Sequence, residues 1–165
     1  MTGNVRLTPV DERTLEPLLC VAVTEAEPDE VMPPVDAPTG WSHARREAFR
    51  RFHRSNYGGL DGPAHTMMYA IVRDGDVVGM IRMARRDEPD TVETGMWLGR
   101  SVRGQGIGVA ALRLLLGEAA QAGACRVVAE TTTQNTGALW VLRRCGAVLR
   151  DDGAGVRAEI ALVGH

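Results

Sequence analysis

The residues with the clearest chemical pattern are three glycines in the segment 103–108, which reads RGQGIG. Glycine lets a backbone approach a ligand closely and adopt positive φ angles. The segment follows a predicted strand at 91–98 and precedes a predicted helix at about 106–122. The first N–H groups of that helix and the positive end of its dipole would face the turn. The segment therefore predicts an anion site, and phosphate is the commonest ligand of such sites.

Two familiar phosphate-binding motifs do not fit this segment. A P-loop needs a lysine, and all 19 basic residues of the chain are arginine. The same absence excludes enzymes that form a Schiff base on a lysine amine. The dinucleotide motif G-x-G-x-x-G fails because Val109 stands at its third glycine position. On spacing alone, the alternative remains that the glycines only form a tight connection between strand and helix and bind no ligand.

The composition is that of an ordinary globular chain. Of the 165 residues, 44% are hydrophobic and 24% are charged, which suits a single domain over residues 1–165. A formal net charge of −2 disfavours a nucleic-acid partner, because phosphate backbones are bound by concentrated positive charge. We expect no membrane span and a cytoplasmic location, and no metal site or disulfide framework built from Cys20, Cys125 and Cys145.

Hydrophobic periodicity and turn residues predict a mixture of antiparallel strands and helices. Asp74-Gly75, a dipeptide favoured in two-residue hairpin turns, joins strands at 66–73 and 76–85. Asp11 is expected to cap the first helix, Ser42 starts a basic helix over 42–54, and the acidic, proline-rich stretch 25–40 is predicted to be a loop. The remaining predicted elements are strands at 5–9, 91–98, 126–132, 147–151 and 156–163 and helices at about 106–122 and 136–145. The fold class is α/β, with antiparallel strands first and crossover helices after them.

Three sequence blocks in the right order resemble the GNAT superfamily, the acetyl-CoA-dependent N-acetyltransferases. Arg103, Gly106 and Gly108 occupy the motif R/Q-x-x-G-x-G/A, and the preceding VETGMWL (92–98) is similar to the family's A-E-x-G-x-W-L. TTTQN (131–135) and TGALWVLRRCGA (136–147) follow where the family has a strand, an asparagine and a helix ending in Lys/Arg-x-Gly-Phe, with Ala147 in place of Phe. The resemblance covers about residues 66–150. It implies the GNAT fold, a mixed, mostly antiparallel central sheet of six to seven strands with about four helices.

The resemblance implies acetyl-CoA as co-substrate. Its pyrophosphate would be held by backbone amides of Arg103, Gly104, Gln105, Gly106, Ile107 and Gly108. The strand end at Met96, Trp97 and Leu98 would pair with the pantetheine arm as an extra strand would. Asn135 stands where the family often contacts that arm, and capping the following helix is an equally open role.

Direct attack of an amine on the thioester is the mechanism that the resemblance implies. Glu93 is the first candidate for the base, acting directly or through water, and Glu130 is the second. Many family members carry a tyrosine seven residues after the asparagine as the acid for the thiolate, but here that position is Leu142. Water or the amine's own proton would then protonate the thiolate. The missing tyrosine and Ala138 are typical of the branch related to ribosomal-protein N-terminal acetyltransferases.

The acceptor is expected to bind between the first helices and the strand edges. Acidic residues of the stretch 25–40, Glu30 and Asp36 among them, suit a small cationic amine such as an aminoglycoside antibiotic, unless they are simply solvated. VMPPVDAPTGW (31–41) and FHRSNYGGLDGP (52–63) are faintly similar to kasugamycin-type resistance members of the family. Trp41 and Tyr69 either line the same site or pack in the core. The alternatives are the N-terminus of a protein as acceptor and a sensor that binds acyl-CoA without catalysis; homodimers are frequent in the family.

Overall fold

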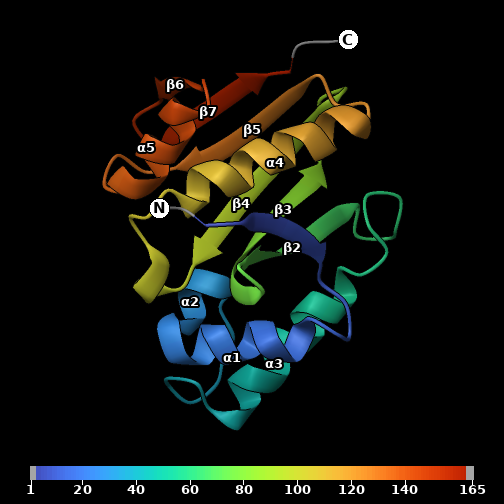
Figure 1. Ribbon diagram of the computed structural model, residues 1–165, viewed down its shortest axis with the longest axis vertical. Coiled ribbons are helices and arrows are strands. Elements are labelled where there is room, and N and C mark those ends of the chain that lie inside the picture. The colour runs from blue at the N-terminus through green and yellow to red at the C-terminus, as the bar shows by residue number, and fades with distance from the viewer. Residues whose placement is uncertain (1–2, 163–165) are drawn as a thin grey trace.

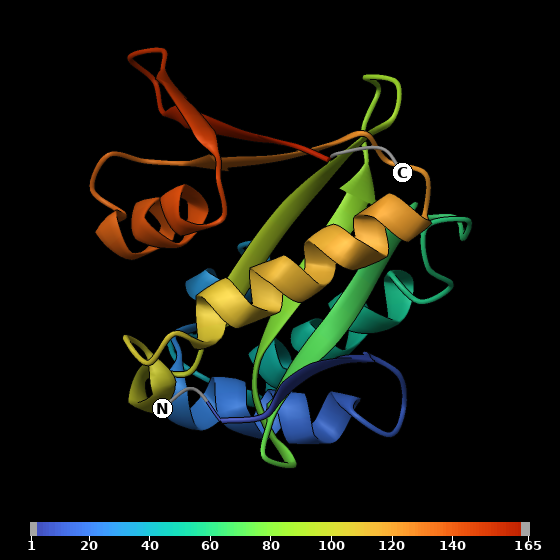
Figure 2. The same cartoon turned by 45° about the horizontal axis from the view of Figure 1, so that its top comes forward.

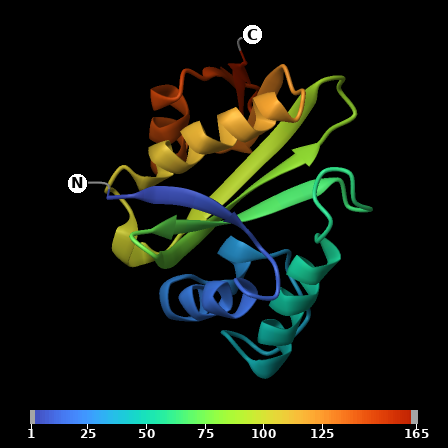
Figure 3. The ribbon, with the colours of Figure 1, turned by 45° about the vertical axis from the view of Figure 1, so that its right-hand side comes forward.

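Seven strands form one sheet with helices on both faces, as Figures 1 and 3 show for the computed structural model, which describes residues 3–162. Helices α1 (Leu15–Glu25), α2 (Pro28–Val31) and α3 (His43–Ser55) lie on one side, and α4 (Ile107–Gln121) and α5 (Thr136–Arg144) lie on the other. The strands are β1 (Val5–Pro9), β2 (Thr66–Arg73), β3 (Asp76–Arg85), β4 (Thr91–Leu98), β5 (Arg126–Thr131), β6 (Val148–Asp151) and β7 (Val156–Ala161), and a 3-10 turn, η1 (Arg100–Val102), follows β4.

The sheet order is β1-β2-β3-β4-β5-β7-β6, and every neighbouring pair is antiparallel except β4 and β5. The predicted hairpin turn between β2 and β3 is confirmed, because Asp74 and Gly75 have positive φ angles of 51° and 90°, as a type I′ turn requires. Helix α4 makes the crossover that the parallel pair needs. The predicted order, antiparallel strands first and crossover helices after them, is therefore confirmed.

Strands β4 and β5 pair only over their first residues. Their register runs from Thr91 opposite Arg126 to Glu93 opposite Val128, and beyond that point the two strands diverge, as Figure 2 shows. Strand β5 pairs instead with β7 along its whole length. The divergence opens a gap inside the sheet. Among the described residues, the edge of β4 that faces β5 has no strand partner from Thr94 onward.

Two apolar clusters hold the helices on the sheet. On one face α4 packs Ile107, Leu112 and Leu115 against β2 and β3, and each of these side chains is at most 1% exposed. Burying such a side chain is worth roughly 1.5–3 kcal/mol. On the other face α1 and α3 pack against Met80 and Trp97. This second cluster contains no described residue of β5, β6 or β7, so α1–α3 leave that part of the sheet uncovered.

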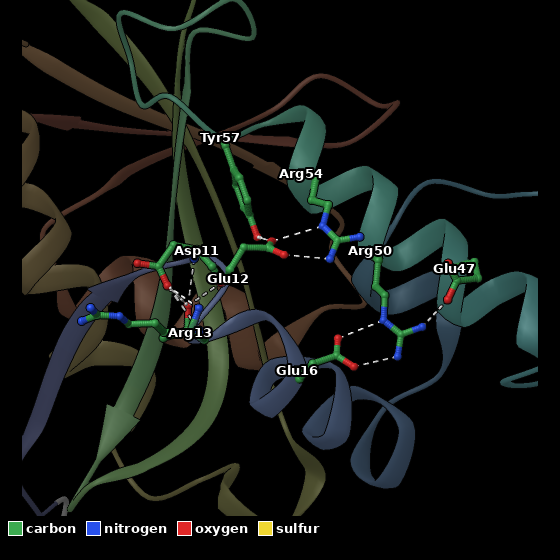
Figure 4. A network of polar contacts seen from close by, with 9 residues as sticks. Asp11, Glu12, Arg13, Glu16, Glu47, Arg50, Arg54 and Tyr57 are labelled. Atoms are coloured by element: carbon green, nitrogen blue, oxygen red, sulfur yellow. Dashed lines mark hydrogen bonds and ion pairs between the residues drawn. The ribbon is translucent and has the colours of Figure 1, made fainter.

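Polar contacts tie α1 to α3 at the rim of the second cluster (Figure 4). Arg50 pairs with Glu16 at 2.7 Å, and Arg54 pairs with Glu12 at 2.8 Å. Tyr57 donates a further hydrogen bond to Glu12, also at 2.8 Å. The contacts fix the position of the two helices that cover β3.

Three local details differ from the sequence-based expectations. The stretch 25–40 is not wholly loop, because Pro28 starts the single turn α2, a position that proline favours. Asp11 does not cap α1 but accepts hydrogen bonds from the backbone of Arg13 and Thr14, and Thr14 is the N-cap. Ser42 does cap α3, as predicted. His53, which no pattern singled out, is completely buried on the inner side of α3.

Candidate active site

A pocket of about 180 Å³ lies at the fork between β4 and β5. It is bounded by the two diverging strands, by α4 and by the start of α5. Its lining residues are Thr94, Gly95, Met96, Leu112, Ala129, Glu130, Thr131, Asn135, Ala138, Val141 and Leu142. Leu142 is buried and carries no proton to give, so the described lining holds no tyrosine at the position where many GNAT enzymes have one.

The free edge of β4 faces this pocket. Gly99 donates its N–H to Val78 on the β3 side at 2.9 Å. Because backbone groups alternate between the two edges of a strand, those of Met96 and Leu98 point to the opposite edge, towards β5. The Leu98 carbonyl accepts a hydrogen bond from the Arg103 side chain at 3.0 Å. The edge therefore offers donors and acceptors in the pattern that an added strand would use.

The loop 103–108 joins this edge to α4 and has the backbone geometry of an anion site. Gly104 and Gly106 have φ angles of 76° and 82°, which non-glycine residues rarely adopt. Gly106 is the N-cap of α4, and no side chain caps the first N–H groups of the helix. A Cβ atom on Gly104 would meet nothing within 4 Å, and one on Gly108 would lie 3.1 Å from Val141 of α5. The loop thus presents uncapped amides beside an open space, which fits a phosphate group.

Acidic residues at the α1–α2 junction hold this loop in place. The contacts are Glu25 with the Ser101 N–H at 2.7 Å, Glu27 with Arg100 at 2.9 Å, and Glu30 with Arg103 at 2.8 Å. The hydrogen bonds from Ser101 hold the pKa of Glu25 below its usual range. Gln105 accepts a hydrogen bond from Arg73 at 2.6 Å and donates one to the backbone of Ser101. Glu30, expected from the sequence to meet the acceptor, is instead the ion-pair partner of Arg103.

Asn135 has the capping role that the sequence left open, and it also lies in the lining of the pocket. Its side chain accepts a hydrogen bond from the Ala138 N–H at 3.2 Å and so caps α5. The same residue lines the pocket. Capping fixes where α5 begins, and hence where Ala138 and Leu142 lie on the pocket wall.

Glu93 is held by two guanidinium groups. Its neighbour Val92 packs in the α4-side cluster, so Glu93 points to the opposite face of the sheet. One carboxylate oxygen accepts from Arg82 at 3.0 Å and the other from Arg86 at 2.8 Å, while the side chain is 15% exposed. The Arg82 guanidinium lies over Gly95, where a Cβ atom would be 3.0 Å from its terminal nitrogen. Sequence reasoning did not identify Arg82. Its only signal in the sequence is Gly95 of β4, the glycine over which its guanidinium lies.

Glu130 lines the pocket without such partners. Ala129 packs in the α4-side cluster, so Glu130 faces the same side of the sheet as Glu93. It is exposed and makes no ion pair within residues 3–162. Gly95 and Glu130 both line the pocket, and the guanidinium of Arg82 lies next to Gly95. The pocket thus has a carboxylate without an ion-pair partner in its lining and a guanidinium next to another lining residue.

The other candidate residues do not gather at the pocket. Trp41 packs edge-on against α3, and its indole N–H donates to a backbone carbonyl at the end of α1 at 2.9 Å. Asp36 is exposed in the α2–α3 connection. Tyr69 is buried in the α4-side cluster, where burial, with Glu118 adding to it, raises its pKa to about 12. Trp97, expected beside the pantetheine arm, is buried in the α1–α3 cluster, although its backbone belongs to β4.

No cluster of His, Cys, Asp or Glu side chains suited to a metal ion occurs within residues 3–162. Over the same residues, no helix has the length and apolar character that crossing a membrane requires. The three cysteines are free thiols.

A seven-stranded sheet forked between β4 and β5, with an uncapped glycine-rich loop ahead of α4, is the arrangement that the resemblance to the GNAT acetyltransferases implies. The chain belongs to the acetyltransferase (GNAT) domain family, which it matches over residues 4–148. A comparison with curated protein sequences gave no significant match.

Solved structures share this fold over nearly the whole chain. One is RimL, a ribosomal L7/L12 alpha-N-protein acetyltransferase in complex with coenzyme A, with 21% identity and a TM-score of 0.77 over 96% of this chain and 94% of that chain. Mycobacterium smegmatis RimJ in complex with CoA-disulfide has 20% identity and a TM-score of 0.76, over 97% and 83%. The microcin C7 self-immunity acetyltransferase MccE, in complex with acetyl-CoA and AMP, has 14% identity and a TM-score of 0.72, over 95% and 92%.

Proposed function

We propose that this N-acetyltransferase transfers the acetyl group of acetyl-CoA to the α-amino group of a peptide or protein. The pocket at the fork takes the acetyl-pantetheine arm, and the loop 103–108 takes the pyrophosphate. This donor placement is supported by the open β4 edge at Met96 and Leu98 and by the uncapped first turn of α4. The acceptor assignment is carried by one observation, the carboxylate of Glu130 that lines the pocket without an ion-pair partner, while the Arg82 guanidinium lies next to Gly95, another lining residue.

An α-amino group matches that pair of side chains. Its nitrogen is two bonds from a carbonyl carbon, so an ammonium and a carbonyl oxygen reach the site together. Glu130 accepts hydrogen bonds from the ammonium, and Arg82 donates to the carbonyl oxygen with the N–H groups that Glu93 does not use. Glu93 acts as a positioning residue, since it holds Arg82 over Gly95. RimL, named for acetylating the α-amino group of a ribosomal protein, shares the fold.

A small cationic amine, such as an aminoglycoside antibiotic, is the second candidate acceptor. Glu130 would suit one of its ammonium groups, and Asp36 is exposed on the α2–α3 connection. A polycation needs several unpaired carboxylates, however, and Glu25, Glu30 and Glu93 already accept hydrogen bonds from other groups of the chain. The peptide acceptor therefore fits better.

Glu93 and Glu130 differ in how well each can act as the base that deprotonates the acceptor ammonium. Both oxygens of Glu93 accept hydrogen bonds from guanidinium groups, whereas Glu130 is unpaired, so Glu130 takes the proton of the ammonium. The neutral amine then attacks the thioester carbon; the C–N bond forms, the C–S bond breaks, and the electron pair leaves with sulfur. The attacking nitrogen still carries the proton that the thiolate needs, and it passes directly or through water because Leu142 offers none.

An acceptor panel tests the proposed function. Release of free CoA thiol is followed with acetyl-CoA and either peptides with a free α-amine, the same peptides with a blocked N-terminus and a free lysine, aminoglycosides, or polyamines. We expect turnover with the free α-amine alone. Turnover of aminoglycosides alone would overturn the peptide acceptor, and CoA binding without turnover of any amine would favour the sensor.

Paired variants test the base. We expect Glu130→Gln to lower kcat/KM by about 10²–10⁴. Glu93→Gln removes a support of Arg82 but no base, so its main effect should be a raised KM for the acceptor. The reverse ranking of the two variants would return the role of base to Glu93.

A further inference from the structure

One face of the sheet is left bare by the helices over β5, β7 and β6. Helices α1–α3 pack against β2, β3 and β4, and Figures 1 and 3 both show them at the other end of the molecule from β6 and β7. Helices α4 and α5 cover the opposite face. An antiparallel sheet that is bare on one face carries polar side chains there. This bare face continues directly from Glu130, which lines the pocket.

The strand register places three charged side chains in one row on the bare face. Glu130 of β5 is opposite Arg157 of β7, and Arg157 is opposite Arg150 of β6. Ala158 and Leu149 pack in the α4-side cluster, so Arg157 and Arg150 point to the bare face, as Glu130 does. Neighbouring strands are about 4.8 Å apart, so the row extends roughly 10 Å from Glu130 to Arg150.

The two arginines of this row keep donors that the protein does not use. One terminal nitrogen of Arg157 bonds both oxygens of Glu88, at 2.9 and 3.2 Å, and its other side-chain nitrogens make no hydrogen bond within residues 3–162. Arg150 is exposed and makes no ion pair over the same residues. Two like charges directly opposite each other in a sheet lower its stability. An anion bound between Arg157 and Arg150 would remove that cost.

We propose that Arg157 and Arg150 bind an acidic side chain at the second or third residue of the acceptor peptide. The inference rests on the proposed function, with the α-ammonium of the acceptor at Glu130. Such an acceptor carries a cation and then, a short distance along the chain, an anion. The row presents the complementary charges in the same order, a carboxylate first and two guanidinium groups after it. Each guanidinium offers paired N–H donors that match the two oxygens of a carboxylate.

The length and direction of a peptide fit this row. An extended chain advances about 3.3 Å per residue, so side chains of the second and third residues reach a point roughly 5–10 Å from the α-amine. A carbonyl carbon carries its oxygen and the next peptide nitrogen in different directions. A first carbonyl oxygen that accepts from Arg82 on β3 therefore leaves the chain to continue on the other side, over β7 and β6.

A matched set of peptides tests the inference. The peptides share one N-terminal residue and an amidated C-terminus, and they differ only in having Asp, Asn or Arg at the second or third position. We expect kcat/KM for the Asp peptides to exceed that for the Asn peptides by about threefold to tenfold, with the Arg peptides poorest. The difference should lie in the KM for the peptide and should shrink as the salt concentration rises, because exposed charges are screened.

Variants of Arg150 assign this preference to the row. Arg150→Gln should remove the preference for Asp, and Arg150→Glu should reverse it in favour of the Arg peptides. Arg6→Gln is the matched control, since Arg6 is exposed on β1, the opposite edge strand, and makes no ion pair within residues 3–162. It changes the net charge by the same amount and should keep the preference for Asp. Thermal unfolding checks that each variant is folded.

Two kinds of failure are distinguishable. Equal kcat/KM for the Asp and Asn peptides in the wild type would overturn the inference, and so would a preference for Asp that survives in Arg150→Gln. Either result leaves the α-amine acceptor in place, because the peptides are still acetylated. If no peptide with a free α-amine is acetylated, the proposed function itself is wrong, and the inference falls with it.

Discussion

Glu93 and Glu130 share a residue type and a face of the sheet but differ in what surrounds them. Glu93 carries two guanidinium partners, and Glu130 carries none within the described chain. A carboxylate that already accepts from two cations is a structural anchor, whereas an unpaired one at a pocket mouth is available to a substrate. At the residue scale, the partners of a side chain decide what chemistry remains open to it.

His53 shows the same principle for stability. Its ring is 0% exposed, lies against Phe49 and Phe52 with centroid distances of 4.5 and 5.2 Å, and has no hydrogen-bond partner for either nitrogen in the described structure. Burial lowers the pKa of His53 from 6.5 to about 4. The unfolded chain therefore binds a proton below about pH 6.5 that the folded chain takes up only near pH 4, so stability falls as the pH falls through this window.

We expect His53→Leu to be more stable than the wild type at pH 7 by about 1–3 kcal/mol, because an unpartnered buried polar group is removed. Between pH 7 and pH 5 the wild type should lose about 2 kcal/mol of unfolding free energy that the variant keeps. Urea unfolding at a series of pH values measures both effects. Parallel pH curves for the two proteins would contradict a neutral, buried histidine.

At the scale of elements, helices α1 and α2 position the segment that leads from β4 into the glycine-rich loop. The α1–α2 junction contacts the segment after β4 through Glu25, Glu27 and Glu30. Gly99 permits this approach, since a Cβ atom there would lie 3.1–3.2 Å from the Glu25 side chain. A shift of α1 would thus move the loop that faces the start of α4.

Glu25→Ala should raise the KM for acetyl-CoA about threefold to tenfold, because the Ser101 N–H loses a charged acceptor at 2.7 Å. Glu27→Ala is the matched control, since it breaks only an exposed ion pair with Arg100 and should change KM less than twofold. Steady-state kinetics with varied acetyl-CoA checks the pair. Equal values for both variants would show that the loop does not depend on this contact.

The spacing of β3 and β4 depends on Gly79. A Cβ atom there would overlap the backbone carbonyl oxygen of Trp97. We expect Gly79→Ala to destabilise the protein by about 1–3 kcal/mol or more through overpacking. Gly117→Ala, on the open side of α4, should instead stabilise it by about 1 kcal/mol. Thermal unfolding distinguishes the two, and a tolerated Gly79→Ala would mean that the strands separate easily.

An element could be predicted from the sequence where the residues that determine it are neighbours along the chain. The hairpin turn at Asp74-Gly75 and the cap at Ser42 depend on neighbouring residues, and both were predicted. Helix α2 was missed because four residues carry too little periodicity to distinguish a turn of helix from loop. The fork between β4 and β5 depends on pairing between strands far apart in the sequence, so only the resemblance to a family indicated a ligand there.

At the scale of the whole molecule, arginine neutralises acids that the sequence presents as runs. The acidic stretch at 25–30 is paired with η1 and the loop, and Glu88 after β3 is paired with Arg157 of β7 at 2.9 Å. Counting charges along the chain therefore overstates how strongly the protein attracts a cationic acceptor. Strand register and helix packing decide which acidic side chains form ion pairs with arginine, and a charge count does not show them. The family and the co-substrate were predictable because their motif is continuous in sequence.

The absence of lysine has a consequence for the whole enzyme. No side chain carries an amine, so guanidinium groups take the place of ammonium groups as the cations open to the phosphates of acetyl-CoA. We expect an amine-acylating ester to leave wild-type activity unchanged. Phenylglyoxal, which modifies arginine, should abolish activity, and CoA should protect against it.

Introducing single lysines localises this effect. Arg103 lies at the loop, bonded to the Leu98 carbonyl and Glu30, so Arg103→Lys places the sole side-chain amine of the protein beside the donor site. Acylation of that variant should raise its KM for acetyl-CoA, and bound CoA should slow the labelling seen by mass spectrometry. Arg13→Lys, exposed ahead of α1 at the end away from Glu25, is the control and should be labelled without loss of activity. If the two lysines are labelled equally in the presence of CoA, the donor does not cover the loop, because a bound pyrophosphate would shield the first lysine and not the second.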